Sequence, residues 1–287
     1  MAQLGFIGLG MMGFPMAGRL VSAGVSVVAY DVVADTRKRF AAAFPGAAVA
    51  DGLRSLCTCD MVITMLPNSD IVDATVHELA PALPAGALVI DMSSADPVRT
   101  RALAEALNAQ GKTLIDAPVS GGVTRATAGT LAIMAGGAAA DIERARPVLA
   151  HLGSSITPVG PIGAGHAMKA LNNYVSAAGL IATAEALVAG QRFGIDPNVM
   201  VDVLNSSTGK NNTTENKVKQ FMLSGAFNSG FSLALMAKDV GIAAELAKAV
   251  DASMQLGAHV SGMCADASEA LGKGADHTEM YRYVQPR

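Results

Sequence analysis

The chain has 287 residues, of which 51% are hydrophobic and only 16% are charged, and its formal net charge is −3. This length allows about two domains. Without a basic run, the sequence argues against nucleic acid and an anionic membrane surface as partners. Soluble domains usually carry ~25% charged residues, so we expect part of the apolar surplus at a subunit interface.

The cysteines and histidines bear on metal binding and on location. Cys57, Cys59 and Cys264 are odd in number and lack the spacing of metal ligands. We interpret them as reduced thiols of a cytoplasmic protein. The five histidines form no metal-binding pattern, so no metal site is predicted. A strand begins by Leu4, and we therefore expect no signal or transit peptide.

The first pattern along the chain is a strand, a tight turn and a helix. Residues 3–13, QLGFIGLGMMG, contain a short apolar run followed by Gly8, Gly10 and Gly13, and an amphipathic helix pattern comes next. In such a turn the first glycine permits the bend. The second lets the backbone approach a pyrophosphate, and the third lets helix and strand pack. Unpaired N–H groups at the start of the helix then face the phosphates.

The second strand supports a dinucleotide site. It covers residues 25–31 and ends in Asp31, whose carboxylate can accept hydrogen bonds from an adenosine ribose. A carboxylate there would repel a 2′-phosphate, so NAD is predicted in preference to NADP. Arg37 and Lys38 follow closely and could favour NADP instead. A purely structural role for Asp31, as a cap of the strand end, also remains open.

Alternating helices and strands continue to residue 159. We predict a helix at 36–43, a strand near Ala47, a helix near Leu53, and strands at 61–66, 87–91, 113–117, 130–136 and 155–159. This alternation predicts a doubly wound α/β sheet. Ligands of such sheets lie beyond the carboxyl ends of the strands. The polar turns at 67–70, 92–94 and 117–122 are therefore candidate walls of a site.

Two of these turns have alternative explanations. Ser93 and Ser94 could instead cap a helix that begins near Pro97. Ser120, Gly121 and Gly122 could form an ordinary loop, although two glycines after a serine also make a concave run of N–H donors suited to a carboxylate.

A long helix is predicted over residues 163–193, GAGHAMKALNNYVSAAGLIATAEALVAGQRF. It contains no proline and could run for ~40 Å. Its uncharged part, between Lys169 and Glu185, is shorter than the ~20 residues of a membrane span. Lys169 and Asn173 are four residues apart and share one face. A lone helical lysine more often extends its amine to solvent, and that explanation stays open at this point.

Only helical patterns follow. A helix starts at Asp196-Pro197, a polar patch covers 205–216, and further helices are expected near 218–223, 233–250 and 253–271. Lys238 and Asp239 form a charged pair within an apolar helix, for which a solvated face or an ion pair is the default explanation. We therefore predict a dinucleotide-binding domain at 1–162 and an all-helical domain at 163–287.

Several motifs in this order resemble the β-hydroxyacid dehydrogenases, which include 3-hydroxyisobutyrate dehydrogenase and tartronate semialdehyde reductase. The resemblance covers the whole chain and is carried by GFIGLGMMGFPMAGRL, MLPNSD, DMSSADP, DAPVSGG, GAGHAMKALNN and FSLALMAKD. It implies a Rossmann domain joined by the long helix to a helical domain that mediates dimer or tetramer assembly. It also implies catalysis by Lys169, with Asn173 orienting this lysine or the substrate, and a substrate carboxylate held by Ser120, Gly121 and Gly122. The implied cofactor-binding residues are Gly8, Gly10, Met11, Met12, Gly13, Asp31, Leu66, Pro67, Asn68, Ser94 and Lys238.

One departure from the family bears on the substrate. Where 3-hydroxyisobutyrate dehydrogenases typically have an aromatic residue, this chain reads SSTGKNNTTEN from Ser206 to Asn216. The polar Asn211, Asn212, Thr213 and Thr214 favour a more hydrophilic substrate. Alternatives are therefore a tartronate semialdehyde or sulfolactaldehyde-type reductase, or a catalytically silent dinucleotide-binding protein.

The reaction expected from the resemblance interconverts a small β-hydroxy acid and its semialdehyde or β-keto form by hydride transfer to or from NAD. A lysine can serve as acid or base where burial and a nearby cationic ring disfavour its charged form. Lys169 is the preferred candidate. His166, one turn earlier, is the rival base, but its place in the first turn of the helix favours exposure to solvent.

Overall fold

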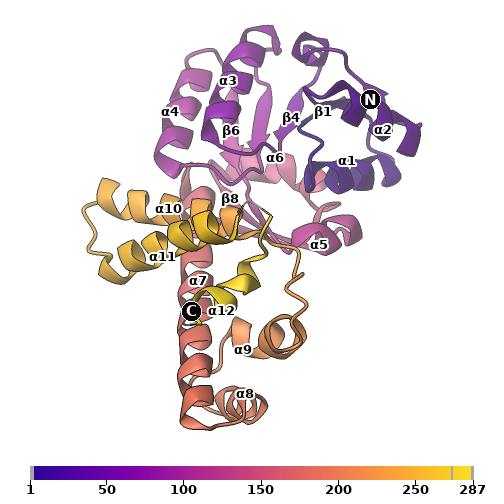
Figure 1. The fold of residues 1–287 in the computed structure, drawn as a ribbon. Helices are drawn as coiled ribbons and strands as arrows, with labels where there is room; N and C mark the ends of the chain where they lie inside the picture. The colour runs from indigo at the N-terminus through magenta and orange to yellow at the C-terminus, as the bar shows by residue number, and fades with distance from the viewer. Residues whose placement is uncertain (1–2, 273, 286–287) are drawn as a thin grey trace. The chain divides into compact units, whose positions relative to one another are not determined.

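The computed structural model describes residues 3–272 and 274–285. The chain divides into two compact units, residues 1–169 and 170–287. Figure 1 shows the ribbon, coloured from indigo at the N-terminus to yellow at the C-terminus. The division falls inside the long helix α7 (Ala164–Phe193), so Lys169 is the last residue of the first unit.

The first unit is built on one sheet, whose strands among the described residues are β1 (Leu4–Ile7), β2 (Val27–Tyr30), β3 (Ala48–Val49), β4 (Met61–Thr64), β5 (Leu88–Asp91), β6 (Thr113–Asp116), β7 (Val119–Ser120), β8 (Leu131–Gly136) and β9 (Gly153–Gly160). Six strands are parallel in the order β3-β2-β1-β4-β5-β6. Strand β8 then runs antiparallel to β6 and β7, and β9 is parallel to β8. The strand order reverses between β1 and β4, where doubly wound sheets bind their ligands.

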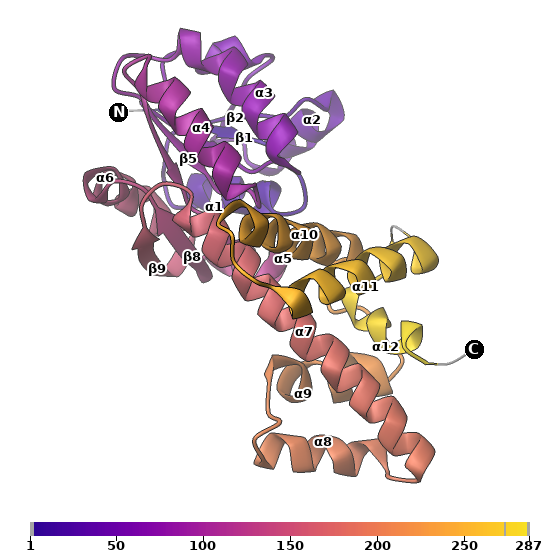
Figure 2. The ribbon, with the colours of Figure 1, turned by 90° about the vertical axis from the view of Figure 1, so that its left-hand side faces the viewer.

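Helices cover both faces of this sheet (Figure 2). The helices of the unit that precede α7 are α1 (Gly13–Ser22), α2 (Ala34–Ala43), α3 (Ser69–Leu79), α4 (Pro97–Asn108), α5 (Gly122–Ala128) and α6 (Ala139–Leu149), with 3₁₀ turns η1 (Leu53–Leu56) and η2 (Ala80–Ala82). Alternate strand residues enter two separate cores. Leu88 and Ile90 pack in the core that holds α1, α2, α5 and α6, whereas Val89 packs against α3 and α4. Burial on both faces explains why these strands are continuous apolar runs.

The predicted doubly wound sheet is confirmed, and most predicted strands lie within one or two residues of their expected bounds. The two-residue strand β7 and the short helix α5 were not predicted, because the 117–122 turn carries glycines and a proline that indicate a loop. Their order depends on pairing with β8, which the local sequence does not encode.

The named elements of the second unit, among its described residues, are helices and helical turns. It contains most of α7, followed by α8 (Pro197–Ser206), α9 (Asn212–Asn216), a π-helical turn η3 (Val218–Leu223), α10 (Leu233–Ala249), α11 (Gln255–Leu271), a 3₁₀ turn η4 (His277–Glu279) and α12 (Met280–Tyr283). Helix α7 buries Ala177, Leu180, Ile181, Ala184 and Leu187, at the three- and four-residue spacing of one helix face. Helices α10 and α11 lie side by side in Figure 1 and in Figure 2. None of the described helices is both long enough and apolar enough to cross a membrane.

The polar patch predicted at 205–216 has a structural explanation. Asn211 caps α9: its side-chain oxygen accepts from the N–H groups of Thr213 and Thr214, while the Thr214 hydroxyl accepts from the Asn211 N–H at 3.0 Å. The Asn211 amide also donates to the Thr183 hydroxyl of α7 at 3.1 Å. Two of the four polar side chains invoked for a hydrophilic substrate pocket, those of Asn211 and Thr214, are thus engaged in a capping box.

A second capping box lies near the end of the chain. Burial alone would raise the pKa of Asp276, but hydrogen bonds from His277, Thr278 and Ser229 outweigh it and hold that pKa far below the usual aspartate range. The Ser229 hydroxyl lies 2.8 Å from both carboxylate oxygens. The charged form of Asp276 therefore stabilises this part of the second unit.

Candidate functional site

The turn between β1 and α1 requires its glycines. Gly8 has a φ of +95°, and a Cβ atom there would lie 2.3 Å from the carbonyl oxygen of Met65. A Cβ at Gly13 would lie 1.8 Å from the Gly8 carbonyl oxygen. A Cβ at Gly10 would meet nothing within 4 Å, so this backbone faces open space. Gly8 and Gly13 are thus required by the turn and by the helix packing, while the ligand-binding role of Gly10 stays a prediction.

The start of α1 suits a diphosphate. Met12 occupies the N-cap position without a side-chain cap, and the first turn contains no acidic residue. No side-chain carboxylate of the first turn therefore competes with a ligand for the backbone N–H groups of α1, and the helix dipole favours an anion there. Met11 is exposed beside this turn. These residues fit the pyrophosphate of a dinucleotide.

Asp31 follows β2 and faces the glycine turn. Its carboxylate accepts from the Leu9 N–H at 2.7 Å and from the Val33 N–H at 2.8 Å. The second bond is the strand-end cap considered above, so the carboxylate has a structural role as well. Arg37 donates to the backbone carbonyl oxygens of Asp31 and Val32 at 2.7 and 3.3 Å. Both the carboxylate and a cation therefore lie where a dinucleotide ribose is recognised in this fold.

The turns after β4 and β5 are joined to each other. The Leu66 N–H donates to the buried Ser93 hydroxyl at 2.9 Å. Asn68 caps α3 by accepting from the Ile71 N–H at 3.0 Å. The alternative that Ser93 or Ser94 caps α4 is wrong, because Asp96 occupies that position and accepts from two backbone N–H groups.

The proposed carboxylate turn has the backbone that the sequence suggested. Gly121 has a φ of +137° and Gly122 a φ of +65°, both of which favour glycine. Helix α5 starts at Gly122 without a side-chain cap or an acidic residue in its first turn. The Arg125 side chain packs over Gly121, within 2.5 Å of where a Cβ would stand. A carboxylate would thus meet uncapped N–H groups near a cation.

The start of α7 is anchored by a buried carboxylate. Asp116, at the end of β6, accepts from the Gly163 N–H through Oδ1 and from the His166 N–H through Oδ2, each at 2.7 Å. It has no exposed surface. Because this cap comes from a strand 47 residues earlier than Gly163, it fixes the helix that carries Lys169 to the carboxyl edge of the sheet.

His166 is buried, with 1% of its surface exposed, so the expectation that it faces solvent is wrong. The Thr100 hydroxyl lies 2.8 Å from the Asp96 carbonyl oxygen and 2.8 Å from His166 Nδ1, so it links the imidazole to the start of α4. His166 Nε2 lies 3.7 Å from Asp91 Oδ2 without a hydrogen bond. His166 therefore belongs to the support of α7, while Lys169, one turn later, is half-buried.

The second unit contributes another polar group on an apolar background. Asn173 of α7 donates to Asp239 of α10 at 2.6 Å, and both side chains are buried. Lys238 Nζ lies 3.6 Å from the other oxygen of Asp239. Part of the default explanation for Lys238 and Asp239 is thus correct, since they form an ion pair. Sequence reasoning missed the bond to Asn173, for which the only signal was a charged residue at a core position of α10.

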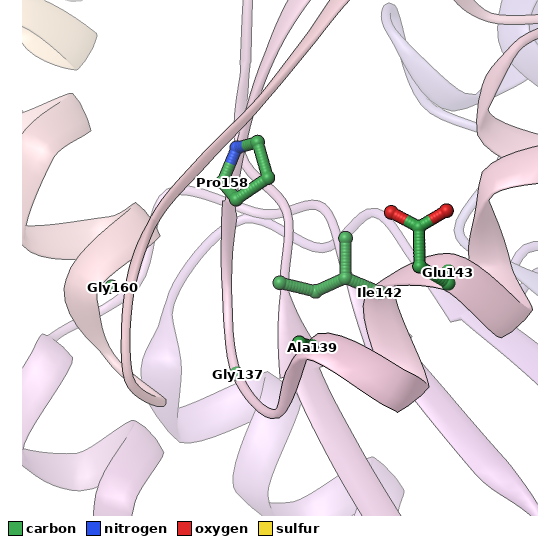
Figure 3. Close-up of a pocket in the computed structure, with 6 residues that line it drawn as sticks. All are labelled: Gly137, Ala139, Ile142, Glu143, Pro158 and Gly160. Carbon is green, nitrogen blue, oxygen red and sulfur yellow. The ribbon is translucent and has the colours of Figure 1, made fainter.

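Surface hollows in the first unit lie elsewhere. One, of about 280 Å³, is lined by Gly137, Ala139, Ile142, Glu143, Pro158 and Gly160 (Figure 3). Another lies over α1, beside Phe14 and Phe44. Neither is lined by any of the predicted site residues.

The fold and these residues define the class of NAD-binding oxidoreductases with a Rossmann-type unit and a helical unit. Residues 3–160 match the family model described as the NAD binding domain of 6-phosphogluconate dehydrogenase. Residues 163–284 match the model described as the NAD-binding domain of NADP-dependent 3-hydroxyisobutyrate dehydrogenase.

Individual proteins that are similar to this chain support the same family as the two matching models. The 3-hydroxyisobutyrate dehydrogenase of Pseudomonas aeruginosa is 39% identical over 90% of this chain and 89% of its own. The 2-(hydroxymethyl)glutarate dehydrogenase of Eubacterium barkeri is 38% identical over 86% and 82%. A structure of the Mycobacterium tuberculosis 3-hydroxyisobutyrate dehydrogenase with L-serine has a TM-score of 0.93 and 34% identity, with 100% of both chains covered. The chain belongs to the β-hydroxyacid dehydrogenase family, and it is an NAD-binding dehydrogenase.

Proposed function

We propose that this dehydrogenase interconverts a small 2-substituted 3-hydroxypropanoate and its aldehyde, with Lys169 as the proton acceptor or donor. The observation that supports the role of Lys169 is its place on α7. The first turn of this helix is capped by Asp116, and Asp116 precedes the Ser120–Gly122 turn by four residues. When bound, NAD accepts the hydride from the carbinol carbon.

The residues of this chain then have separate tasks. Ser120, Gly121 and Gly122 bind the substrate carboxylate through a hydroxyl and N–H groups. Lys169 takes the hydroxyl proton during oxidation and returns it during reduction. Asn173 and Lys238 belong to the second unit and enter the proposal through the family resemblance, Asn173 to orient the substrate and Lys238 to contact the cofactor.

The substrate class follows from the chemistry shared by the named relatives. 3-Hydroxyisobutyrate, L-serine and 2-(hydroxymethyl)glutarate all contain a hydroxymethyl group on the carbon next to a carboxylate. They differ at the third substituent, which is a methyl, an ammonium or a carboxyethyl group. We infer that the Ser120–Gly122 turn binds the shared carboxylate and that Lys169 acts on the shared hydroxymethyl group. The preference for a polar substituent stays a prediction, with Asn212 and Thr213 as the polar side chains outside the α9 capping box.

The test of the proton role is the Lys169→Ala variant. We expect turnover to fall by roughly 10²- to 10⁴-fold, the usual share of general acid–base catalysis, while NAD affinity is retained. Lys169→Arg should be equally impaired, because a guanidinium cannot give up its proton near neutral pH. The matched control is Lys248→Ala, an exposed lysine on α10. Retained turnover in both Lys169 variants would contradict the assignment.

The substrate test is a panel of 3-hydroxypropanoate, 3-hydroxyisobutyrate, L-serine, glycerate and 2-(hydroxymethyl)glutarate, each with NAD and with NADP. We expect oxidation of at least one member with NAD. Activity on none of them, with NAD binding intact, would favour a catalytically silent dinucleotide-binding protein.

We further propose a cytoplasmic homodimer or homotetramer with domains at 1–162 and 163–287. Support for self-association comes from exposed apolar side chains on α7 and α8, which include Val175, Val199, Val203 and Phe193, the last 86% exposed. Support for a reducing compartment comes from the three cysteines, which are all free thiols. Light scattering on the purified protein tests the assembly, and a monomer at micromolar concentration would contradict it.

A further inference from the structure

Asp239 is the exception on the buried side of α10. The other buried residues of this helix are apolar, namely Leu233, Met236, Val240, Ala243 and Ala247. Asp239 is only 3% exposed, and its Oδ1 atom has no hydrogen-bond partner among the described residues. A buried carboxylate costs several kcal/mol of desolvation. An apolar side chain at this position would avoid that desolvation cost, so the contacts of Asp239 need an explanation.

The main contact of Asp239 is the amide of Asn173. Asn173 Nδ2 lies 2.6 Å from Asp239 Oδ2, a short distance for a hydrogen bond to a charged acceptor. The Lys238 ammonium, 3.6 Å from Oδ1, offsets part of the carboxylate charge. All three residues belong to the second unit, so this geometry is local to it.

The contact determines which way the amide points. The two ends of an asparagine amide have nearly the same shape, and only hydrogen-bond partners tell them apart. A carboxylate has acceptors and no donor, so it can face only the NH₂ end. The Asn173 carbonyl oxygen is thereby turned away from Asp239, and in this structure it accepts from Asn172 at 3.1 Å.

We propose that Asp239 is a positioning residue of the dehydrogenase reaction, which holds the Asn173 amide in one orientation so that its carbonyl oxygen accepts from the substrate hydroxyl. The inference rests on the proposed function, in which Asn173 orients the substrate. Asp239 itself touches neither substrate nor cofactor in this scheme. With a neutral partner the charge-assisted hydrogen bond that holds this orientation is lost, and the NH₂ end of the amide can face the substrate hydroxyl instead.

The test is a double-mutant cycle on kcat/KM for the alcohol substrate, with Asp239→Asn, Asn173→Ala and the double variant. We expect Asp239→Asn to lower kcat/KM by roughly tenfold to a hundredfold, the share of one hydrogen bond to a charged group. In the Asn173→Ala background the same change should have less than a threefold effect, because the amide that Asp239 orients is gone. The matched control is Glu245→Gln, an exposed carboxylate of α10, which should leave kcat/KM unchanged.

A merely structural role predicts a different pattern. Asp239→Asn would then lower kcat/KM by the same factor in both backgrounds, in parallel with a loss of thermal stability, and this additivity would overturn the inference. If Asp239→Asn does not fold, Asp239→Glu replaces it in the cycle, since it keeps the charge but displaces the acceptor. Full activity of Asn173→Ala would instead contradict the proposed function, so the two failures are distinguishable.

Discussion

The sharpest prediction concerns the cap of α7. Asp116 uses its two oxygens separately: Oδ1 accepts from Gly163 and Oδ2 from His166. An asparagine keeps only one acceptor, so Asp116→Asn must leave one buried N–H facing an NH₂ group. A hydrogen bond to a charged group contributes about 1.5–3 kcal/mol, and an unsatisfied buried donor costs about 1–3 kcal/mol. We therefore expect the free energy of unfolding to fall by about 2.5–6 kcal/mol, the sum of the two.

Asp96→Asn is the matched control. Asp96 caps α4 through Oδ1 alone, which accepts from both Val98 and Arg99. An asparagine retains that oxygen, and the two residues are nearly equivalent as caps, so the loss should stay below about 0.5 kcal/mol. Urea unfolding followed by circular dichroism measures both variants against the parent. Equal midpoint shifts would refute the idea that the two-oxygen geometry of Asp116 anchors α7.

Three further predictions test the cofactor turn, the packing of α7 and the C-terminal capping box. Asp31→Asn should raise the NADP-to-NAD ratio of kcat/KM by roughly tenfold, because Arg37 remains while the repelling carboxylate is removed; an unchanged ratio would show that Asp31 only caps its strand. Gly165→Ala places a Cβ 2.4 and 2.8 Å from two carbonyl oxygens and should lower the melting temperature, whereas Gly241→Ala in α10 meets nothing within 4 Å and should raise stability by about 1 kcal/mol. Asp276 has a lowered pKa in the fold, so its stabilisation is complete above the unfolded pKa and is lost as the pH falls below about 4; urea titrations at successive pH values should show a shallower acid loss for Asp276→Asn.

The local parts of the fold could be predicted from the sequence. The glycine turn, the strand ending before Asp31 and the extent of α7 depend on neighbouring residues, through turn chemistry and apolar periodicity. The structure places the start of α7 one residue from its expected position. The sequence did not predict the contacts of polar residues with partners that are far away along the chain. The burial of His166 comes from Thr100 and the ends of β5 and β6, and no pattern within the helix indicates it.

The same distinction explains the polar patch before η3. From sequence, Asn211 and its neighbours looked like a ligand surface, because asparagine and threonine are poor residues for a helix interior. A capping box uses those residue types to begin a helix. Helix α9 has only five residues, too few to show the repeating apolar positions by which a helix is recognised in a sequence. The distinction between a cap and a pocket wall lies in which backbone N–H groups need a partner, and that depends on the path of the chain.

Two groups of residues in the first unit should therefore have separable effects on stability and on turnover. Thr64, Asp91 and Asp116 are buried at strand ends, and their hydrogen bonds go to other parts of the protein. Gly10 and Gly122 instead leave room beside their backbone, since a Cβ at either would meet nothing within 4 Å. Changes in the first group should lower stability and reduce turnover in proportion to the displacement of α7. A substitution at Gly10 should leave stability almost intact and alter the KM for the cofactor, whereas a substitution at Gly122 should also lower stability, because its φ of +65° favours glycine.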